Sequence, residues 1–409
     1  MPNIRAATTM PALATALIMI ACAKSDDHFP SKVVASVASS AAKPSWPSNV
    51  GEGVPKFWVR PGFRVTLEAE GFGEARFMEF DNAGNLFVSQ PTLGKIQTFR
   101  LKDGKYTQFA TFLEGKRSVH GLCWANGWLW FTESGSVWKA RDTNGDGKAD
   151  EVVNVLDGLP RGGHWWRSIL VTEDGFFTSI GDSGNATDET ASDRQKIWKY
   201  SLDGKSRKMF VSGIRNTEKL RYRPGTTELY GADHGSDWFG APLGDKEGRQ
   251  PITDLNPPCE FNHYVEGGFY GHPFIVGNRV PRIEFQKRPD ILDLAEKSIS
   301  PAWCFGAHWA PNGWTFLTKP TMGKDLVGDA LVALHGSWNR KEKAGYRIER
   351  VLFDKVTGEP FGGQMLVGTL NENSDVLGRP VDVAEAPDGT ILFSDDATGK
   401  IYRISTVTE

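Results

Sequence analysis

Two residues that flank a short apolar segment offer the clearest chemistry in this chain. His164 precedes a β-prone run, Glu173-Asp174-Gly175 supplies turn residues, and Asp182 follows a second β-prone run. This pattern predicts a β-hairpin, and a hairpin brings the residue before its first strand level with the residue after its second. We therefore expect His164 to act as a general base and the Asp182 carboxylate to orient its imidazole.

Cationic and basic residues recur at the matching positions of other hairpins. Before first strands stand Arg76, His120, His164, Arg215 with Asn216, His308 and Arg379; after second strands stand Gln90, Glu133, Asp182, Asp233 with His234, and Asp395 with Asp396. Arg340 follows a further apolar strand, Ala330 to Leu334. If these ends converge, they form an anion site, because arginine presents a planar fork to carboxylates.

A second constellation has the spacing of a calcium loop. Oxygen ligands alternate along the segment 142–150, with glycine at the sharp turn: Asp142, Asn144, Asp146 and Asp150 through side chains, and Lys148 through its carbonyl. The twelfth position is Val153, so the bidentate glutamate of an EF-hand is missing. We expect a structural Ca²⁺ in a loop between strands, while an Asp/Gly turn without an ion stays open.

The elements that position these residues follow a repeat. Six turns each precede a β-prone run: Asn82-Ala83-Gly84, Ala125-Asn126-Gly127, Glu173-Asp174-Gly175, Pro224-Gly225, Pro311-Asn312-Gly313 and Pro387-Asp388-Gly389. The first four glycines recur at roughly the 40–50 residues of a four-stranded blade. The pattern predicts an all-β, six-bladed β-propeller in which Arg64 to Ala69 completes the blade that ends at Ile404. A β-sandwich is the alternative fold.

The composition and the first residues of the chain indicate where the protein is expected to act. The chain has 409 residues and a net charge of −3, which gives no argument for nucleic-acid binding. We read residues 1–23 as a signal, 24–50 as a flexible linker and 51–409 as the propeller. Cys22 lies in a sequence typical of lipoprotein signals, so we expect export to the periplasm or cell surface, with either a lipid anchor on Cys22 or cleavage that frees the protein.

Three cysteines remain after that signal. Cys123 lies in an apolar strand pattern and is expected to be a buried thiol. Cys259 and Cys304 could form a disulfide in an oxidising compartment, and their spacing leaves the question open.

Several motifs together resemble one family. They are GGHWWRSILVTEDGFFTSIGDSG, GIRNTEKLRYRPGTTELYGADHG, FYGHP, GDALVALHGSWNR and GRPVDVAEAPDGTILFSDDATGKIYRI. From about Gly62 to Ile404 the chain is similar to the glucose/sorbosone dehydrogenases, six-bladed propellers that use pyrroloquinoline quinone (PQQ).

The resemblance implies roles for individual residues. It implies that His164 takes the substrate's hydroxyl proton beside Asp182, that Arg215 and Asn216 contact PQQ, and that Arg340 lies near the quinone. It also implies that Arg379 binds the PQQ carboxylates, and that carbonyls around Gly271 and Pro273 hold an active-site Ca²⁺.

The chain departs from the family pattern at three places. Thr217-Glu218-Lys219 replaces the usual Pro-Gln-Gly, His272 replaces a tryptophan, and His120 stands where some members carry an amide. Glu218 would bring a carboxylate near an anionic cofactor, which is unfavourable unless a cation compensates.

These observations predict an exported enzyme that oxidises an aldose or related sugar at C1 with PQQ and Ca²⁺; the electron acceptor stays open. One alternative is a metal-dependent hydrolase or lyase acting on a sugar or lactone, suggested by the extra carboxylates Glu133, Glu218, Asp233 and Asp237. Another is a propeller that binds a glycan or a protein, suggested by Trp165, Trp166 and Trp238.

Overall fold

The structure is a computed structural model that describes residues 47–240 and 252–407. The chain divides into two units, Met1–Ser45 and Trp46–Glu409, and the account below concerns the second. The predicted signal, Cys22 and most of the predicted linker lie outside the described residues. Within those residues, no helix is long and apolar enough to cross a membrane.

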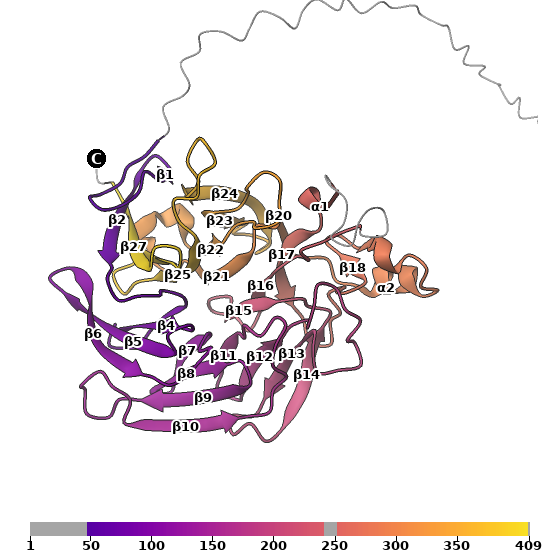
Figure 1. The fold of residues 1–409 in the computed structure, drawn as a ribbon, viewed down its shortest axis with the longest axis horizontal. Helices are drawn as coiled ribbons and strands as arrows, with labels where there is room; N and C mark the ends of the chain where they lie inside the picture. The colour runs from indigo at the N-terminus through magenta and orange to yellow at the C-terminus, as the bar shows by residue number, and fades with distance from the viewer. Residues whose placement is uncertain (1–46, 241–251, 408–409) are drawn as a thin grey trace, which may run out of the picture. The chain divides into compact units, whose positions relative to one another are not determined.

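Six small antiparallel sheets follow one another around a ring (Figure 1). The first three blades consist of β3 (Met78–Phe80), β4 (Leu86–Gln90), β5 (Lys95–Lys102) and β6 (Lys105–Leu113); β7 (Leu122–Ala125), β8 (Trp128–Glu133), β9 (Ser136–Arg141) and β10 (Glu151–Leu156); and β11 (Ile169–Val171), β12 (Phe176–Ile180), β13 (Lys196–Tyr200) and β14 (Arg207–Ser212).

The other three blades recruit strands from farther along the chain. They consist of β15 (Thr217–Tyr222), β16 (Leu229–Asp233), β17 (Pro258–Tyr264) and β20 (Trp303–Ala307); β21 (Pro311–Phe316), β22 (Ala330–Leu334), β23 (Arg347–Phe353), β24 (Pro360–Gly368) and β1 (Trp58–Val59); and β25 (Pro380–Glu385), β26 (Ile391–Asp395), β27 (Lys400–Thr406) and β2 (Phe63–Ala69).

The ring closes where the sequence predicted. β2 pairs antiparallel with β27, with Arg64 opposite Ser405 and Val65 opposite Ile404. A strand from near the start of the folded part thus completes the sheet of the last blade. The all-β, six-bladed propeller is therefore confirmed, and the β-sandwich is excluded.

The folded part begins slightly before the predicted boundary at residue 51. Val65 donates its backbone N–H to Asn49, and Val59 donates to Pro47. The last residues of the predicted linker thus add to the edges of β1 and β2.

One predicted turn is wrong. Pro311-Asn312-Gly313 opens strand β21, which pairs with β22, and so these residues do not form the turn of a hairpin. Gly313 is needed for close packing, because a Cβ there would lie 1.9 Å from Asp382 Oδ1. A glycine that permits close approach carries the same sequence signal as a turn glycine.

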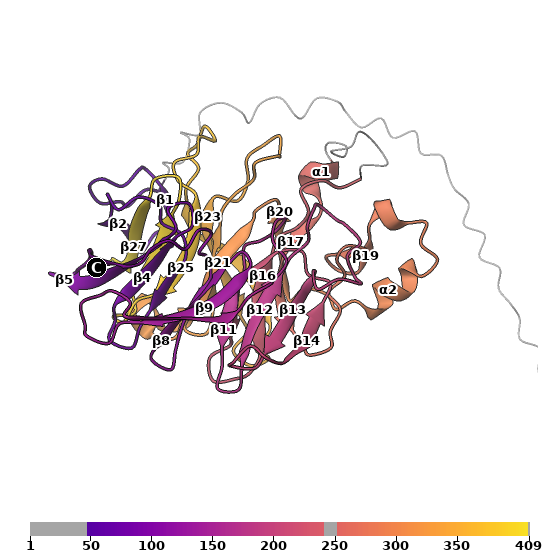
Figure 2. The same cartoon turned by 60° about the horizontal axis from the view of Figure 1, so that its bottom comes forward.

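The fourth blade carries the main insertions. The short helix α1 (Ile252–Leu255) precedes β17, and a segment with β18 (Ile275–Val276), β19 (Val280–Pro281), η2 (Ile283–Phe285) and α2 (Ile291–Lys297) precedes β20. Figures 1 and 2 both show α2 at the outside of the ring. The fifth blade adds two short 3₁₀ turns, η3 (Pro320–Met322) and η4 (Lys324–Leu326).

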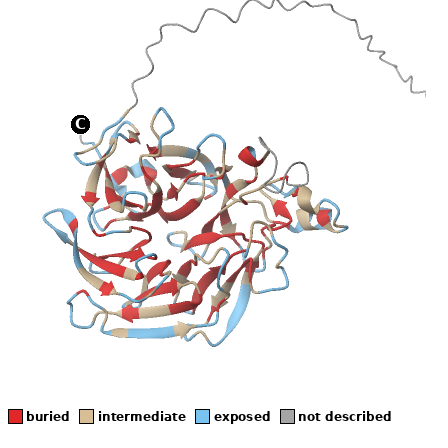
Figure 3. Cartoon of the chain, in the orientation of Figure 1, coloured by how far each residue is buried: buried red, intermediate tan, exposed pale blue. Residues whose placement is uncertain are grey.

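Apolar side chains pack between neighbouring blades, and inner strands are more buried than outer ones (Figure 3). For example, Phe393 and Tyr402 of the sixth blade pack against Phe57, next to β1 of the fifth. Outer strand β10, in contrast, leaves Val152 and Val153 exposed. The ring is thus held by blade-to-blade burial of apolar surface.

Ion pairs inside the ring link blades that are not neighbours. Lys219 Nζ lies 2.7 Å from both carboxylate oxygens of Asp382, which joins the inner strands of the fourth and sixth blades. Arg221 of the same strand pairs with Glu79 of the first blade at 3.0 Å.

The cysteines are free among the described residues. Cys123 and Cys259 are buried, which confirms the prediction for Cys123. Cys259 is paired in register with Phe305, and Glu260 with Cys304. The two cysteine side chains therefore leave opposite faces of the sheet, so this geometry does not allow a Cys259–Cys304 disulfide.

Candidate functional site

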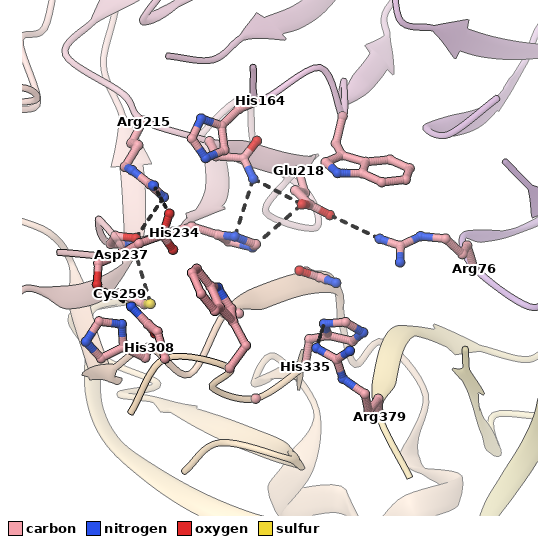
Figure 4. Close-up of a pocket in the computed structure, with 18 residues that line it drawn as sticks. Arg76, His164, Arg215, Glu218, His234, Asp237, Cys259, His308, His335 and Arg379 are labelled. Atoms are coloured by element: carbon pink, nitrogen blue, oxygen red, sulfur yellow. Dashed lines mark hydrogen bonds and ion pairs between the residues drawn. The ribbon is translucent and has the colours of Figure 1, made fainter. Parts of the chain in front are cut away.

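The ends of the inner strands converge on one pocket of about 320 Å³ (Figure 4). Its walls come from five of the six blades, and they include Arg76, His164, Arg215, Glu218, His335 and Arg379. In Figure 4, Arg76, His335 and Arg379 lie on one side of the pocket, and Arg215, Asp237 and His308 lie on the other. The convergence that the repeat predicted is therefore present.

His164 faces this pocket with one nitrogen available. Its backbone N–H and its ring Nδ1–H both donate to the carbonyl oxygen of Asp182, each at 2.9 Å. Because a carbonyl only accepts hydrogen bonds, Nδ1 carries the proton and Nε2 keeps a lone pair in the neutral ring. Burial, reinforced by the charge of Arg215, lowers the pKa of His164 to about 3. The imidazole is thus a neutral proton acceptor at ordinary pH.

A glycine permits this arrangement. Gly163 has a φ of +63°, and a Cβ there would lie 2.4 Å from the Cα of Ser183. The two strand ends can therefore approach closely enough for His164 to reach the carbonyl of Asp182.

The predicted role of the Asp182 carboxylate is wrong. This carboxylate points away from His164 and pairs with Nε2 of His272 at 2.6 Å, while Gln195 donates to it at 2.9 Å. Hairpin geometry fixes the level of the backbone but not the face toward which a side chain points. Asp182 orients the base through its main chain instead.

The Asp182 carboxylate is buried and charged. Burial alone would raise its pKa, but the hydrogen bond and charge of His272 and the amide N–H groups of Gly184 and Thr187 outweigh burial and hold the pKa well below its usual range. Asp182 thus also ties the His164 loop to the insertion of the fourth blade through His272.

Arg215 and Asn216 line the pocket as predicted, but much of their hydrogen-bonding capacity is used within the protein. Arg215 donates from Nε to the Asn185 carbonyl, from Nη1 to the Gly235 carbonyl and from Nη2 to Asp237 at 2.9 Å. The Asn216 amide donates to Glu218 at 3.1 Å, and its buried Oδ1 has no protein partner.

The opposite wall carries a connected group of charges. Arg379 Nη2 donates to Nδ1 of His335, whose Nε2–H lies 3.0 Å from Asp396. Arg76 Nη1 donates to the same carboxylate at 2.7 Å, and its guanidinium lies 4.5 Å from the centre of the Trp166 ring. Arg379 therefore lines the pocket and is held there by His335, and its contact with a cofactor stays a prediction.

Like Asp182, the predicted site residues Arg340, Gly271 and Pro273 lie outside the pocket lining. Arg340 donates from Nη1 to the Ala307 carbonyl at 3.4 Å. The Gly271 carbonyl accepts the N–H groups of Phe274 and Ile275, so it is occupied by its own turn. Pro273 does not reach the pocket wall either.

Glu218 is buried and lies beside His120, His234 and Arg76. Its Oε2 lies 3.4 Å from His120 Nε2 and 4.0 Å from Arg76 Nη2. Burial would raise the pKa of Glu218, but His120, His234 and Arg76 outweigh it and keep the pKa far below its usual range. A negative charge therefore lies in a pocket that the resemblance expected to bind an anion.

The predicted calcium loop closes with its own hydrogen bonds. The Asp142 carboxylate accepts the N–H groups of Asn144, Gly145 and Gly147, and Asp150 accepts from Thr143 and from the Asn144 side chain. Across 47–240 and 252–407, no three His, Cys, Asp or Glu side chains are grouped to hold a metal ion. Calcium at this loop stays a prediction.

Several residues of the pocket wall were not among those expected from the sequence. His335 and Trp338 both follow β22, the strand that also precedes Arg340, and they line the pocket while Arg340 does not. His335 follows β22 directly, so the rule that selected His164 and Asp182 could have found it. Asn312 was hidden by the wrong assignment of a turn.

Comparisons with known proteins agree with this architecture. The structure superimposes on the holo form of the pyranose dehydrogenase PQQ domain from Coprinopsis cinerea with a TM-score of 0.74 and 19% identity, covering 87% of this chain and 100% of the other. A calcium structure of a Trichoderma reesei enzyme of family AA12 superimposes with a TM-score of 0.74 and 18% identity, covering 88% of this chain and 99% of the other. At these identities the likeness establishes the fold alone.

Sequence comparison identifies relatives at two levels. An uncharacterized protein of Borreliella burgdorferi is 31% identical over 209 residues, so the match covers about half of each chain, 51% in both cases. The TrAA12-like family model matches residues 57–407, which is nearly the whole propeller. The resemblance to PQQ-dependent sugar dehydrogenases is thus confirmed at the level of family and fold, and the chain belongs to the TrAA12-like family.

Proposed function

We propose that this chain is a sugar-oxidising dehydrogenase that binds PQQ in the central pocket. The observation that carries the proposal is the neutral His164 imidazole, with Nε2 facing a pocket that three arginines line. The family membership and the description of the Coprinopsis protein as a PQQ domain support the choice of cofactor.

The donors of the pocket fit PQQ, a planar molecule with three carboxylates. Arg76 and Arg379 both line the pocket, and each has a terminal guanidinium nitrogen beyond the one that binds Asp396 or His335, so both can donate to a ligand. The pocket volume also falls in the range of small-molecule sites, roughly 300–1,000 Å³. Arg76 and Arg379 would hold carboxylates, and Arg215 would add charge from the other wall.

The residues of the chain would then divide the reaction between them. When bound, PQQ supplies the acceptor for the hydride that leaves the oxidised carbon of the sugar. His164 Nε2 takes the proton of the hydroxyl group on that carbon, which becomes a carbonyl. The Asp182 carbonyl holds the ring in place, and the low pKa of His164 makes the imidazolium release its proton readily.

Calcium is a proposal that rests on charge balance. Glu218 and Asp237 offset part of the arginine charge in the pocket, so a divalent cation bound together with PQQ would improve the balance. The side chains described here do not form a calcium site by themselves, and no step of the mechanism depends on the ion.

Reconstitution tests this function. The purified protein is titrated with PQQ, with and without Ca²⁺, and dye reduction is measured over a panel of aldoses, each paired with its 1-O-methyl glycoside. Oxidation at C1 requires turnover of the aldose and none of the glycoside, which lacks a free hydroxyl at C1. If PQQ causes no spectral change under any condition, the proposed function is wrong.

Export also remains a proposal, suggested by the sequence around Cys22. Cell fractionation tests it: the protein is expected in the membrane fraction, and Cys22→Ser is expected to release it. Recovery of the wild-type protein from the cytoplasm would contradict export.

No observation favours either alternative function over the dehydrogenase. Of the carboxylates that suggested a hydrolase, Glu218 and Asp237 line the pocket beside cations, Asp233 accepts the N–H groups of Arg215 and Asn216, and Glu133 lies outside the lining. Of the tryptophans that suggested glycan binding, Trp166 lines the pocket and stacks on Trp165.

A further inference from the structure

One wall of the pocket is organised around His335. Its Nδ1 accepts a hydrogen bond from Arg379 Nη2 at 3.0 Å, and its Nε2 lies 3.0 and 3.1 Å from the two oxygens of Asp396. An arginine can only donate and a carboxylate can only accept, so the proton of the neutral ring must be on Nε2. His335 thus bridges Asp396 and Arg379: it donates to the carboxylate through Nε2 and accepts from the guanidinium through Nδ1.

Three blades meet in this group. His335 follows β22 of the fifth blade, Arg379 and Asp396 flank strands of the sixth, and Arg76 precedes β3 of the first. Arg76 donates to Asp396 at 2.7 Å, so the two arginines are fixed from opposite ends of one carboxylate–imidazole pair.

His335 is suited to this task because it stays neutral. A proton on Nδ1 would face the N–H of Arg379, and the His335 side chain is only 15% exposed to water. Burial lowers the pKa of His335, and the charges of Arg379 and Arg76 act in the same direction against the pull of Asp396. The neutral ring can therefore accept from Arg379 and donate to Asp396 together.

The result of this network is two oriented arginines with spare capacity. Both residues line the pocket, and the network holds Nη1 of Arg76 and Nη2 of Arg379, so the other terminal nitrogen of each guanidinium is left for a ligand. We propose that His335 is a positioning residue, which aims Arg379 directly, and Arg76 through Asp396, at the carboxylates of the bound ligand. The identity of that ligand as PQQ rests on the proposed function.

Two variants of nearly equal shape test the proposal. Asn and Leu are similar in size, but only the Asn side chain offers Arg379 an acceptor in place of Nδ1. His335→Leu is expected to weaken PQQ binding about ten- to a hundredfold, the usual effect of losing a hydrogen bond to a charged group. His335→Asn is expected to recover a large part of that loss. A merely structural role would lower affinity equally in both.

Binding is measured by quenching of tryptophan fluorescence, with circular dichroism as the check on folding. His263→Gln is the matched control, because His263 stacks on Tyr230 outside the pocket lining. It should bind PQQ as the wild type does. In addition, the ¹⁵N shifts of the His335 ring should show a proton on Nε2 and none on Nδ1.

The outcomes separate this inference from the proposed function. If the wild type binds PQQ and folded His335→Leu binds it equally well, the positioning role is wrong while the function stands. If the wild type does not bind PQQ, the function fails, and benzene-1,3,5-tricarboxylate becomes the probe; the same ranking of Leu, Asn and wild type must then appear. Absence of that ranking, or a proton on Nδ1, overturns the inference.

Discussion

Removing the buried charge of Lys219 should destabilise the propeller strongly. Lys219 Nζ lies 2.7 Å from both oxygens of Asp382, and the two residues are 5% and 0% exposed. In Lys219→Met, Asp382 would be left charged in the interior, a change that costs about 3–5 kcal/mol in comparable pairs. The carboxylate keeps the N–H groups of Met78 at 2.8 Å and Val383 at 2.9 Å. We therefore expect the lower end, about 3 kcal/mol.

Urea unfolding followed by tryptophan fluorescence measures this loss. Lys208→Met is the matched control: Lys208 forms an ion pair with Glu266 at 2.7 Å on the surface, and loss of such a pair changes stability by about 0–1 kcal/mol. The double variant Lys219→Met/Asp382→Asn should be more stable than Lys219→Met alone, because the uncompensated charge is gone. Equal losses for Lys219→Met and Lys208→Met, or no gain in the double variant, would refute this reasoning.

Three further predictions concern His164 and the 142–150 loop. Burial lowers the pKa of His164 to about 3, so kcat/KM should not fall through protonation of this base between pH 7 and pH 5. A histidine base with an ordinary pKa would instead lower kcat/KM roughly 25-fold over that range. A pH–rate profile in which protonation of His164 lowers kcat/KM near pH 6.5 would contradict this prediction. The same depressed pKa means that, as pH falls below about 6.5, His164 binds a proton in the unfolded chain but not in the folded one. This difference should lower the free energy of unfolding by about 2 kcal/mol by pH 5. Urea unfolding at pH 7 and pH 5 should show a smaller decrease for His164→Asn than for the wild type. Asp142→Ala should lower the free energy of unfolding by about 1–3 kcal/mol, because three loop N–H groups lose their acceptor; if calcium occupies the loop, Ca²⁺ should also raise the Tm of the chelator-treated wild type but not of this variant.

The repeat carried enough information to predict the ring. Turn residues before β-prone runs mark the hairpins, and the alternating pattern of Arg64 to Ala69 identified the strand that closes onto β27. Gly313 shows the limit of this signal. Its lack of a side chain serves close packing against Asp382, which is distant in sequence, and only the folded ring reveals that contact.

Which residues line the pocket was easier to predict than which atoms they contact. Position relative to a strand end selected His164, Arg215 and Arg379 correctly as pocket residues. The same rule could not tell that Asp182 meets His164 through its carbonyl, because side-chain direction at a strand end depends on His272, a residue in a distant insertion.

The residue roles implied by the family resemblance fit some positions of the structure and not others. Arg340 and Gly271 lie near the expected segments, but local hydrogen bonds to the Ala307 carbonyl and from Phe274 and Ile275 draw them away from the pocket. Motif matches place a backbone segment, whereas the donors and acceptors around it decide which atoms remain available for a ligand.

The most direct test of His164 as the base is the turnover of His164→Asn loaded with PQQ. Asparagine can still donate to the Asp182 carbonyl, so the loop should keep its shape, but the acceptor Nε2 is gone. The expected result is a loss of about 10²–10⁴-fold in kcat, with the Kd for PQQ within about threefold of the wild type. A variant that binds PQQ normally and retains wild-type kcat would show that His164 does not accept the proton.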